Sequence, residues 1–156
     1  MQQFLDSWFG QFPIGLAPRL DDVTPEQCQS WLSLLEKLEG PDYQRWQRTP
    51  PGRLGLIILM GTVSKLLNVA DSAFMAKRAY LLCIQGVEWG FDTQLELSQR
   101  RYFYEPLFQS DAQKDKLLLQ KLLFGMRSQL AIDAQLDNGL ALWDLWWSDT
   151  HREALQ

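Results

Sequence analysis

The side chains that could perform acid–base chemistry are few, and most lie in the second half of the chain. His151 lies two residues from both Asp149 and Glu153, and Tyr104 directly precedes Glu105. A histidine beside a carboxylate can move a proton near neutral pH, because the imidazole changes charge there. However, a single histidine in a terminal helix is more often exposed to solvent than catalytic. These pairs are therefore a weak indication of an enzyme.

The established motifs of catalysis and cofactor binding are absent from the sequence. It contains no glycine-rich phosphate loop after a strand, no GxSxG, no HExxH and no DxDxDG loop. One histidine excludes a histidine-rich metal site, and Cys28 and Cys83 lie far apart, without a CxxC spacing. Each cysteine falls in an apolar helical pattern, where a thiol packs as a small hydrophobe. We therefore expect no metal and no other cofactor, and we favour a protein that is not an enzyme.

The overall charge argues against a nucleic-acid partner. The formal net charge is -4 at pH 7, whereas proteins that bind nucleic acids present a basic surface to the phosphates. The N-terminus has no basic segment of a signal peptide, and the longest apolar run, Leu54 to Met60, is far shorter than the roughly 20 residues that span a bilayer. We expect one domain over residues 1–156, located in the cytoplasm and without a membrane partner.

Apolar residues recur at helical spacing along most of the chain, and no segment shows the two-residue alternation of a strand. Thr24, Pro25 and Gln27 form a capping signature at one helix start, and further starts are predicted at Asp71 or Ser72 and at Ser110. The fold predicted is all-α and compact, with about seven helices. They lie at residues 4–9, 25–39, 53–67, 72–89, 100–107, 111–136 and 140–155, with a short helical piece at 43–48.

Two of these helices carry specific expectations. The apolar run that begins at Arg53 continues through Leu67, which is too long for a typical strand and predicts a buried helix. In the helix at 72–89, Phe74, Ala79, Leu82, Cys83 and Val87 are predicted to face inward, and Gly90 to end the helix. Pro106 should break the helix that carries Arg100, because it removes a backbone donor.

Three tryptophans, Trp143, Trp146 and Trp147, lie close together in the last predicted helix. They could close the core, form an interface with a partner or a second copy of the chain, or anchor the helix on a membrane. Asp144 and Asp149 flank them where an anchoring helix would carry basic residues, which argues against a membrane. We favour the core, and keep open an interface, including a homodimer.

Several motifs occur in an order that resembles a known family. They are Phe4–Gly10 (FLDSWFG), Arg53–Leu59 (RLGLIIL) followed by Phe74, Gly90–Asp92 (GFD), Tyr102–Leu107 (YFYEPL) and His151–Glu153 (HRE). Their order resembles a bacterial family called domain of unknown function nine-two-four. The resemblance implies a compact, all-helical architecture of the tetratricopeptide type. It implies no activity, because none comes with the family.

The chain departs from that family at its polar motifs. Where members show Asp-Gln-Phe-Pro-Arg-Asn, this chain has Gly61–Leu66 (GTVSKL), in which only Lys65 is positively charged. Where members show His-Ser-Glu, it has Gln109–Asp111 (QSD). The family's closing segment after the His-Arg stretch is also missing. The resemblance is therefore to a divergent member with a short C-terminal end.

If the family's motif positions face one another, five polar residues converge. They are Lys65, Arg100, Tyr104, Gln109 and His151. Such a cluster could bind an anionic small molecule or a carboxylate-bearing peptide, with the planar guanidinium of Arg100 donating two hydrogen bonds. The competing interpretation, which we favour, is that Arg100 and Lys65 only cap or cross-link helix ends.

Two functional hypotheses follow. The first is a non-catalytic helical module that binds a protein or peptide, or serves as a scaffold, as arrays of helix pairs do. The alternative is a small-molecule-binding protein or enzyme with a pocket near Arg100, Tyr104 and His151.

Overall fold

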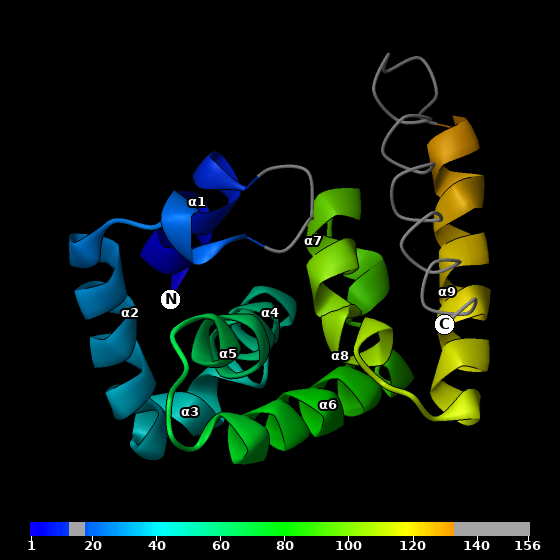
Figure 1. The fold of residues 1–156 in the computed structure, drawn as a ribbon. Helices are drawn as coiled ribbons and strands as arrows, with labels where there is room; N and C mark the ends of the chain where they lie inside the picture. The colour runs from blue at the N-terminus through cyan, green and yellow to red at the C-terminus, as the bar shows by residue number, and fades with distance from the viewer. Residues whose placement is uncertain (13–17, 133–156) are drawn as a thin grey trace. The chain divides into compact units, whose positions relative to one another are not determined.

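The computed structural model describes residues 1–12 and 18–132, and in these two ranges every regular element is a helix (Figure 1). The all-α prediction is confirmed. The α-helices are α1 (Gln2–Gln11), α2 (Pro25–Glu36), α3 (Pro41–Trp46), α4 (Pro50–Ile57), α5 (Ser64–Leu66), α6 (Ser72–Glu88), α7 (Leu97–Phe103), α8 (Glu105–Phe108) and α9 (Gln113–Ile132). Short helical segments lie between them: η1 (Leu20–Asp22), η2 (Lys37–Glu39), the π-helical η3 (Ile58–Val63) and η4 (Asp92–Gln94). The tetratricopeptide-like arrangement stays a prediction.

Contacts divide the chain into two compact units, Met1–Pro106 and Leu107–Gln156. The centre of the first unit is formed by α4 and η3, which α1, α2, α6 and α7 contact (Figure 1). Residues 52–60 are all buried. The predicted buried helix is thus confirmed, and it is the element against which the other helices of this unit pack. The single-domain organisation stays a prediction.

Local sequence accounts for where the central helix begins. The Thr49 hydroxyl accepts a hydrogen bond from the Gly52 backbone N–H at 3.1 Å, and Pro50 occupies a first-turn position that needs no donor. Gly52 is required by a close approach, because a Cβ there would lie 2.2 Å from the Trp46 carbonyl oxygen. The π-helical segment η3 was not anticipated. At its end the Ser64 hydroxyl donates to the Met60 carbonyl, a bond that competes with regular helix pairing.

Helix α6 begins at Ser72 as predicted, although the Asp71 side chain makes no capping hydrogen bond. Its buried face carries Ala79, Leu82 and Cys83. The prediction that Phe74 faces inward was wrong, because this side chain is 63% exposed. The reason is helical geometry: five residues from Phe74 to Ala79 turn the side chains about 140° apart. Gly90, with φ of 75°, follows the helix in the left-handed conformation, as expected of a glycine after a helix end.

The break near Pro106 is also confirmed, since α7 ends at Phe103 and α8 begins at Glu105. In the second unit, the predicted start at Ser110 lies just before α9. Its hydroxyl accepts a hydrogen bond from the Ala112 N–H at 3.2 Å and donates to Asp115 at 2.6 Å.

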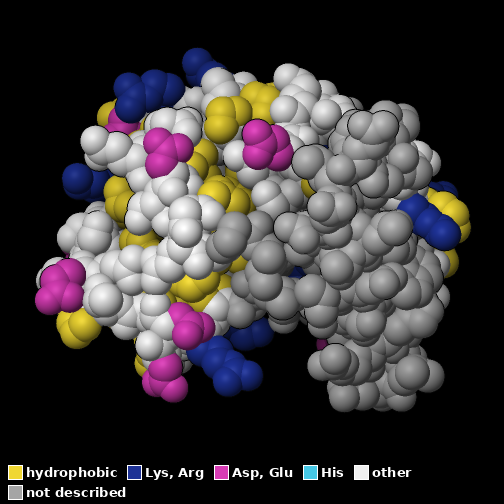
Figure 2. Space-filling model, turned by 90° about the horizontal axis from the view of Figure 1, so that it is seen from above, with side chains coloured by type: hydrophobic (Ala, Val, Ile, Leu, Met, Phe, Trp, Pro, Cys, Tyr) yellow, Lys and Arg dark blue, Asp and Glu magenta, His cyan; other side chains and the backbone are white. Residues whose placement is uncertain are grey.

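The surface seen in Figure 2 mixes side chains of all types. Acidic and basic side chains of the described residues lie interspersed among apolar ones on this face, rather than gathered by sign. No helix in the described ranges is long and apolar enough to cross a membrane.

Candidate functional site

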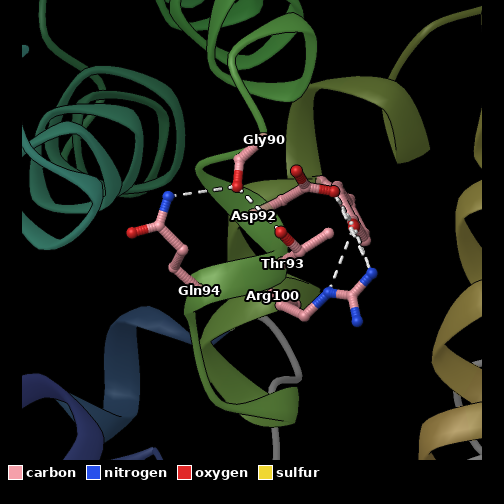
Figure 3. A network of polar contacts seen from close by, with 6 residues as sticks. Gly90, Asp92, Thr93, Gln94 and Arg100 are labelled. Carbon is pink, nitrogen blue, oxygen red and sulfur yellow. Dashed lines mark hydrogen bonds and ion pairs between the residues drawn. The ribbon is translucent and has the colours of Figure 1, made fainter.

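A buried network joins the short segment η4 to helix α7 through Asp92, Tyr104 and Arg100 (Figure 3). The Tyr104 hydroxyl donates to Asp92 Oδ2 at 2.5 Å. Arg100 Nε and Nη2 donate to the same Tyr104 oxygen at 3.2 and 2.9 Å, and Nη2 lies 3.9 Å from Asp92 Oδ2. One tyrosine oxygen thus connects a carboxylate to a guanidinium.

The turn after α6 positions the carboxylate of this network. Gly90 turns the chain, and its carbonyl oxygen accepts from the Thr93 hydroxyl at 2.8 Å and from Gln94 Nε2 at 3.4 Å (Figure 3). These bonds hold the short segment on which Asp92 lies. The positions of Arg100 and Tyr104, four residues apart on a helical stretch, place their side chains one above the other.

The three side chains of this network are buried, which affects the protonation of Tyr104. Asp92 is 2% exposed, Tyr104 is fully buried and Arg100 is 8% exposed. Burial and the hydrogen bond to Asp92 raise the pKa of Tyr104 above its ordinary value of 10.0. The hydroxyl therefore keeps its proton at neutral pH and serves as a donor. The network links η4 to the end of α7 through bonds that these three side chains make to one another.

A second buried ion pair joins Glu105 to Arg101 rather than to Tyr104, the neighbour suggested by the sequence. Arg101 Nη1 lies 2.5 Å from Glu105 Oε2, with both side chains almost fully buried. Glu105 was a candidate acid–base partner of Tyr104, and the structure pairs each with a different residue. Adjacent residues on a helix point about 100° apart, so neighbours in sequence rarely meet.

A third feature is a fully buried arginine, Arg53, in the central helix α4. Its Nε donates to the Gln47 carbonyl at 2.8 Å, and Nη1 donates to the Leu82 carbonyl at 3.0 Å and to Gln85 Oε1 at 3.2 Å. Its Nη2 is buried and has no hydrogen-bond partner among the described residues. Within residues 1–12 and 18–132, no carboxylate lies within ion-pair distance of this guanidinium.

Aromatic rings lie against the Arg53 guanidinium where a carboxylate would be expected. Its Cζ is 4.5 Å from the centroid of the Trp89 ring and 5.6 Å from that of Phe91. The negative faces of aromatic rings attract a cation. Burial nevertheless lowers the pKa of Arg53, which reflects the cost of removing its charge from water. Gly86 makes room for this arrangement, since a Cβ there would lie 2.9 Å from Arg53 Cδ.

The exposed face of α6 carries large apolar side chains. Phe74 is 63% exposed, Leu81 is 60% exposed and Trp89, directly after the helix, is 52% exposed. Between them, the Arg78 guanidinium lies 4.3 Å from the Tyr43 ring and 5.8 Å from the Phe74 ring. An apolar row with aromatic and cationic side chains is therefore open to solvent along one helix.

The structure brings together only part of the predicted site. Arg100 and Tyr104 meet, as expected. Lys65 is exposed on α5, and Gln109 is exposed after α8 in the second unit. His151 and the tryptophan group Trp143, Trp146 and Trp147 lie outside the described residues. The assignment of these residues to a ligand site or an interface stays a prediction. Among the residues that are described, no group of three or more metal-ligating side chains comes together.

Sequence reasoning missed Asp92, Arg53 and Trp89. Asp92 was assigned to a loop, and nothing local indicates that it reaches Tyr104 twelve residues later. For Arg53 a signal existed, because a charged residue opening an otherwise apolar buried run must find partners inside the protein. Trp89 gave no signal of its own, since its contact with Arg53 depends on how two helices pack.

Comparison with known proteins identifies a family. The family model described as bacterial protein of unknown function (DUF924) matches residues 2–153, and the chain belongs to this family. No curated protein and no solved structure matches the chain.

Proposed function

We propose that this member of the DUF924 family is a non-catalytic module that binds a protein or peptide along the exposed face of α6. The observation that supports the proposal is the row of Phe74, Leu81 and Trp89, each more than half exposed. At about 100° per residue, their positions fall within a sector of roughly 80° on one side of the helix. A single exposed apolar residue is ordinary, whereas an aligned row has the pattern of a recognition surface.

The dimensions of the row suit a peptide. From Phe74 to Trp89 the helix rises about 22 Å, since each residue adds 1.5 Å. A partner helix presents anchors at three- and four-residue intervals that can follow such a row. Phenylalanine and tryptophan offer large contact areas at a low entropic cost, and Arg78 adds a planar cation that stacks on aromatic rings.

The arrangement of buried polar groups favours binding over catalysis. Asp92, Tyr104 and Arg100 are bonded to one another. A catalytic base needs a lone pair directed at substrate, and Tyr104 instead holds its proton toward Asp92. The alternative pocket near Arg100, Tyr104 and His151 is therefore the weaker proposal.

Selection of peptides against variants of the α6 face tests the proposal. Random peptides are selected on the full chain, and the affinity of the enriched peptides is measured by fluorescence anisotropy. The double variant Phe74→Ser with Leu81→Ser should weaken binding at least about tenfold, because two exposed anchors are removed. Unchanged thermal unfolding would show that both side chains act through the surface.

A matched control lies on α9, where Phe124 is 60% exposed and Leu117 is 50% exposed. The double variant Phe124→Ser with Leu117→Ser removes the same side chains from another helix and should leave the affinity unchanged. Failure to enrich any peptide, or equal loss in the two double variants, would overturn the proposed function.

A further inference from the structure

The Arg53 guanidinium has more donors than the protein around it accepts. It carries five N–H groups. The Gln47 carbonyl takes the Nε proton, and the Leu82 carbonyl and Gln85 Oε1 take those of Nη1. Within the part of the chain that the structure describes, the two protons of Nη2 have no acceptor, although the atom is buried. A buried donor without a partner is rare in folded proteins, and one on a charged group is rarer still.

An anion is the natural partner for the remaining nitrogen of such a guanidinium, because N–H bonds from a charged donor to a carboxylate or phosphate are strong. Nε and Nη1 are already bonded to the protein, so such an anion would accept from Nη2 alone. Among the described residues this arginine has no carboxylate, whereas Arg101 has Glu105 and Arg100 has Asp92. What sets Arg53 apart from these two arginines is that it has no carboxylate partner among the described residues.

Trp89 covers one face of this charged group. The ring lies over the guanidinium, with its centroid 4.5 Å from Cζ, and the side chain is 52% exposed while Arg53 is fully buried. Trp89 follows the last residue of α6 and precedes Gly90, which has a positive φ. Exposed side chains change rotamer within nanoseconds, so movement of this ring is a fast way to open the site.

The position of Trp89 connects this buried charge with the proposed peptide surface. The apolar row on α6 runs from Phe74 through Leu81 and ends at Trp89. A peptide that lies along the row thus reaches Arg53 where the row ends. The chain end of such a peptide carries a carboxylate at that point if its C-terminus is oriented toward Trp89.

We propose that Arg53 and Trp89 form a receptor for the C-terminal carboxylate of the peptide that binds α6. Trp89 turns from the face of the guanidinium, and Nη2 donates to the carboxylate while Nε and Nη1 stay bonded to the protein. The ring then packs against the last side chain of the peptide. This proposal rests on the proposed function and adds the chemistry by which one end of the partner is recognised.

The test compares each α6-binding peptide with the same peptide carrying a C-terminal amide. The amide removes the charge and one acceptor oxygen, so its affinity for the wild-type chain should be at least about tenfold lower. No substitution in the protein is needed, and the result does not depend on whether a variant of the buried arginine folds. A second amidated peptide carries an acidic side chain. It shows whether a side-chain carboxylate can replace the carboxylate of the C-terminus.

Four outcomes are distinguishable. Weaker binding of both amidated peptides supports the receptor. Equal binding of acid and amide, with loss in the Phe74→Ser and Leu81→Ser double variant, leaves the proposed function standing and overturns the receptor. Absence of binding by either form overturns both proposals. Recovery of full affinity by the acidic side chain alone would also overturn the assignment to a C-terminal carboxylate.

A spectroscopic measurement reports on Trp89 directly. In protein labelled with fluorotryptophan, the Trp89 resonance is assigned by its disappearance in Trp89→Phe. The free-acid peptide should shift this resonance more than the amide at equal occupancy of the site, because only the carboxylate displaces the ring. Equal shifts with both peptides would contradict the proposed movement.

Discussion

The guanidinium of Arg53 is stacked on the ring of Trp89, with 4.5 Å between Cζ and the ring centroid, although one side chain is fully buried and the other is 52% exposed. A charge in the interior is thus stabilised by a residue at the surface. Substitutions of Trp89 should consequently lower the stability of the first unit, because Arg53 lies in its central helix α4.

Trp89→Ala should destabilise the protein by about 0.5–2 kcal/mol, because it removes the cation–π contact with Arg53. Trp89→Phe keeps an aromatic face and should lose less than half as much. Unfolding in urea, followed by far-UV circular dichroism, measures both. Equal losses in the two variants would show that the ring face does not stabilise the cation.

Arg53→Ala should destabilise the protein by about 2–5 kcal/mol, the range for truncating a long buried side chain. Arg53→Met should cost markedly less. It fills most of the volume, and it removes a buried charge that lacks a carboxylate partner among the described residues. The urea midpoints of the two variants test this order. If methionine were as damaging as alanine, the bonds to Gln47 and Leu82 would outweigh the cost of burying the charge.

Tyr104→Phe should destabilise the protein by about 1–3 kcal/mol, because it removes the donor to buried Asp92 and the acceptor for Arg100. The ring volume is unchanged, so the loss reports the hydroxyl alone. Adding Asp92→Asn to this variant should cost less than it does in the wild type. Strictly additive losses in this double-mutant cycle would mean that the two side chains are not coupled.

Stability should fall as the pH rises above about 10, the pH at which an unfolded tyrosine releases its proton. Burial raises the pKa of both Tyr104 and Tyr102 above the ordinary value of 10.0. Above pH 10 the unfolded state therefore binds fewer protons than the folded state, at a cost of about 1.4 kcal/mol per pH unit for each tyrosine. Urea unfolding from pH 8 to 11 measures the slope, which Tyr104→Phe should reduce. An unchanged slope in that variant would contradict the assignment.

Gly86→Ala and Gly125→Ala should act in opposite directions. A Cβ on Gly86 would lie 2.5 Å from Phe103 Cζ and 2.9 Å from Arg53 Cδ, so alanine should cost about 1–3 kcal/mol. A Cβ on Gly125, inside α9, meets nothing within 4 Å. Alanine there should stabilise the protein by about 0.5–1 kcal/mol, through helix propensity. Thermal unfolding distinguishes the signs.

Much of the chain's local structure is determined by the sequence itself. The Thr24 hydroxyl accepts from the Gln27 N–H at 3.2 Å, and Gln27 Oε1 accepts from the Thr24 N–H at 3.1 Å, as the capping signature predicts. Gly90 follows α6 with a positive φ, and the chain breaks between α7 and α8 two residues before Pro106. Each of these features depends on residues within about four positions, so their order along the chain suffices to predict them.

Part of the candidate site was also open to prediction. Arg100 and Tyr104 are four residues apart, which on a helix brings their side chains together. Their third partner, Asp92, and the pairing of Glu105 with Arg101 were not anticipated. Among several neighbouring groups that can bond, the choice depends on which faces of the helices are buried.

Only the tertiary structure decided the surroundings of Arg53. Its bond to Leu82 spans 29 residues and its bond to Gln85 spans 32, and its contact with Trp89 is longer still in sequence. Local rules determined that Arg53 would begin an apolar helix and that α6 would begin at Ser72. They could not determine which face of α6 would meet that helix, because this depends on the packing of all the helices around α4. The sequence thus determined the helices. Their packing buried the Arg53 cation beneath a half-exposed tryptophan, with no carboxylate partner among the described residues.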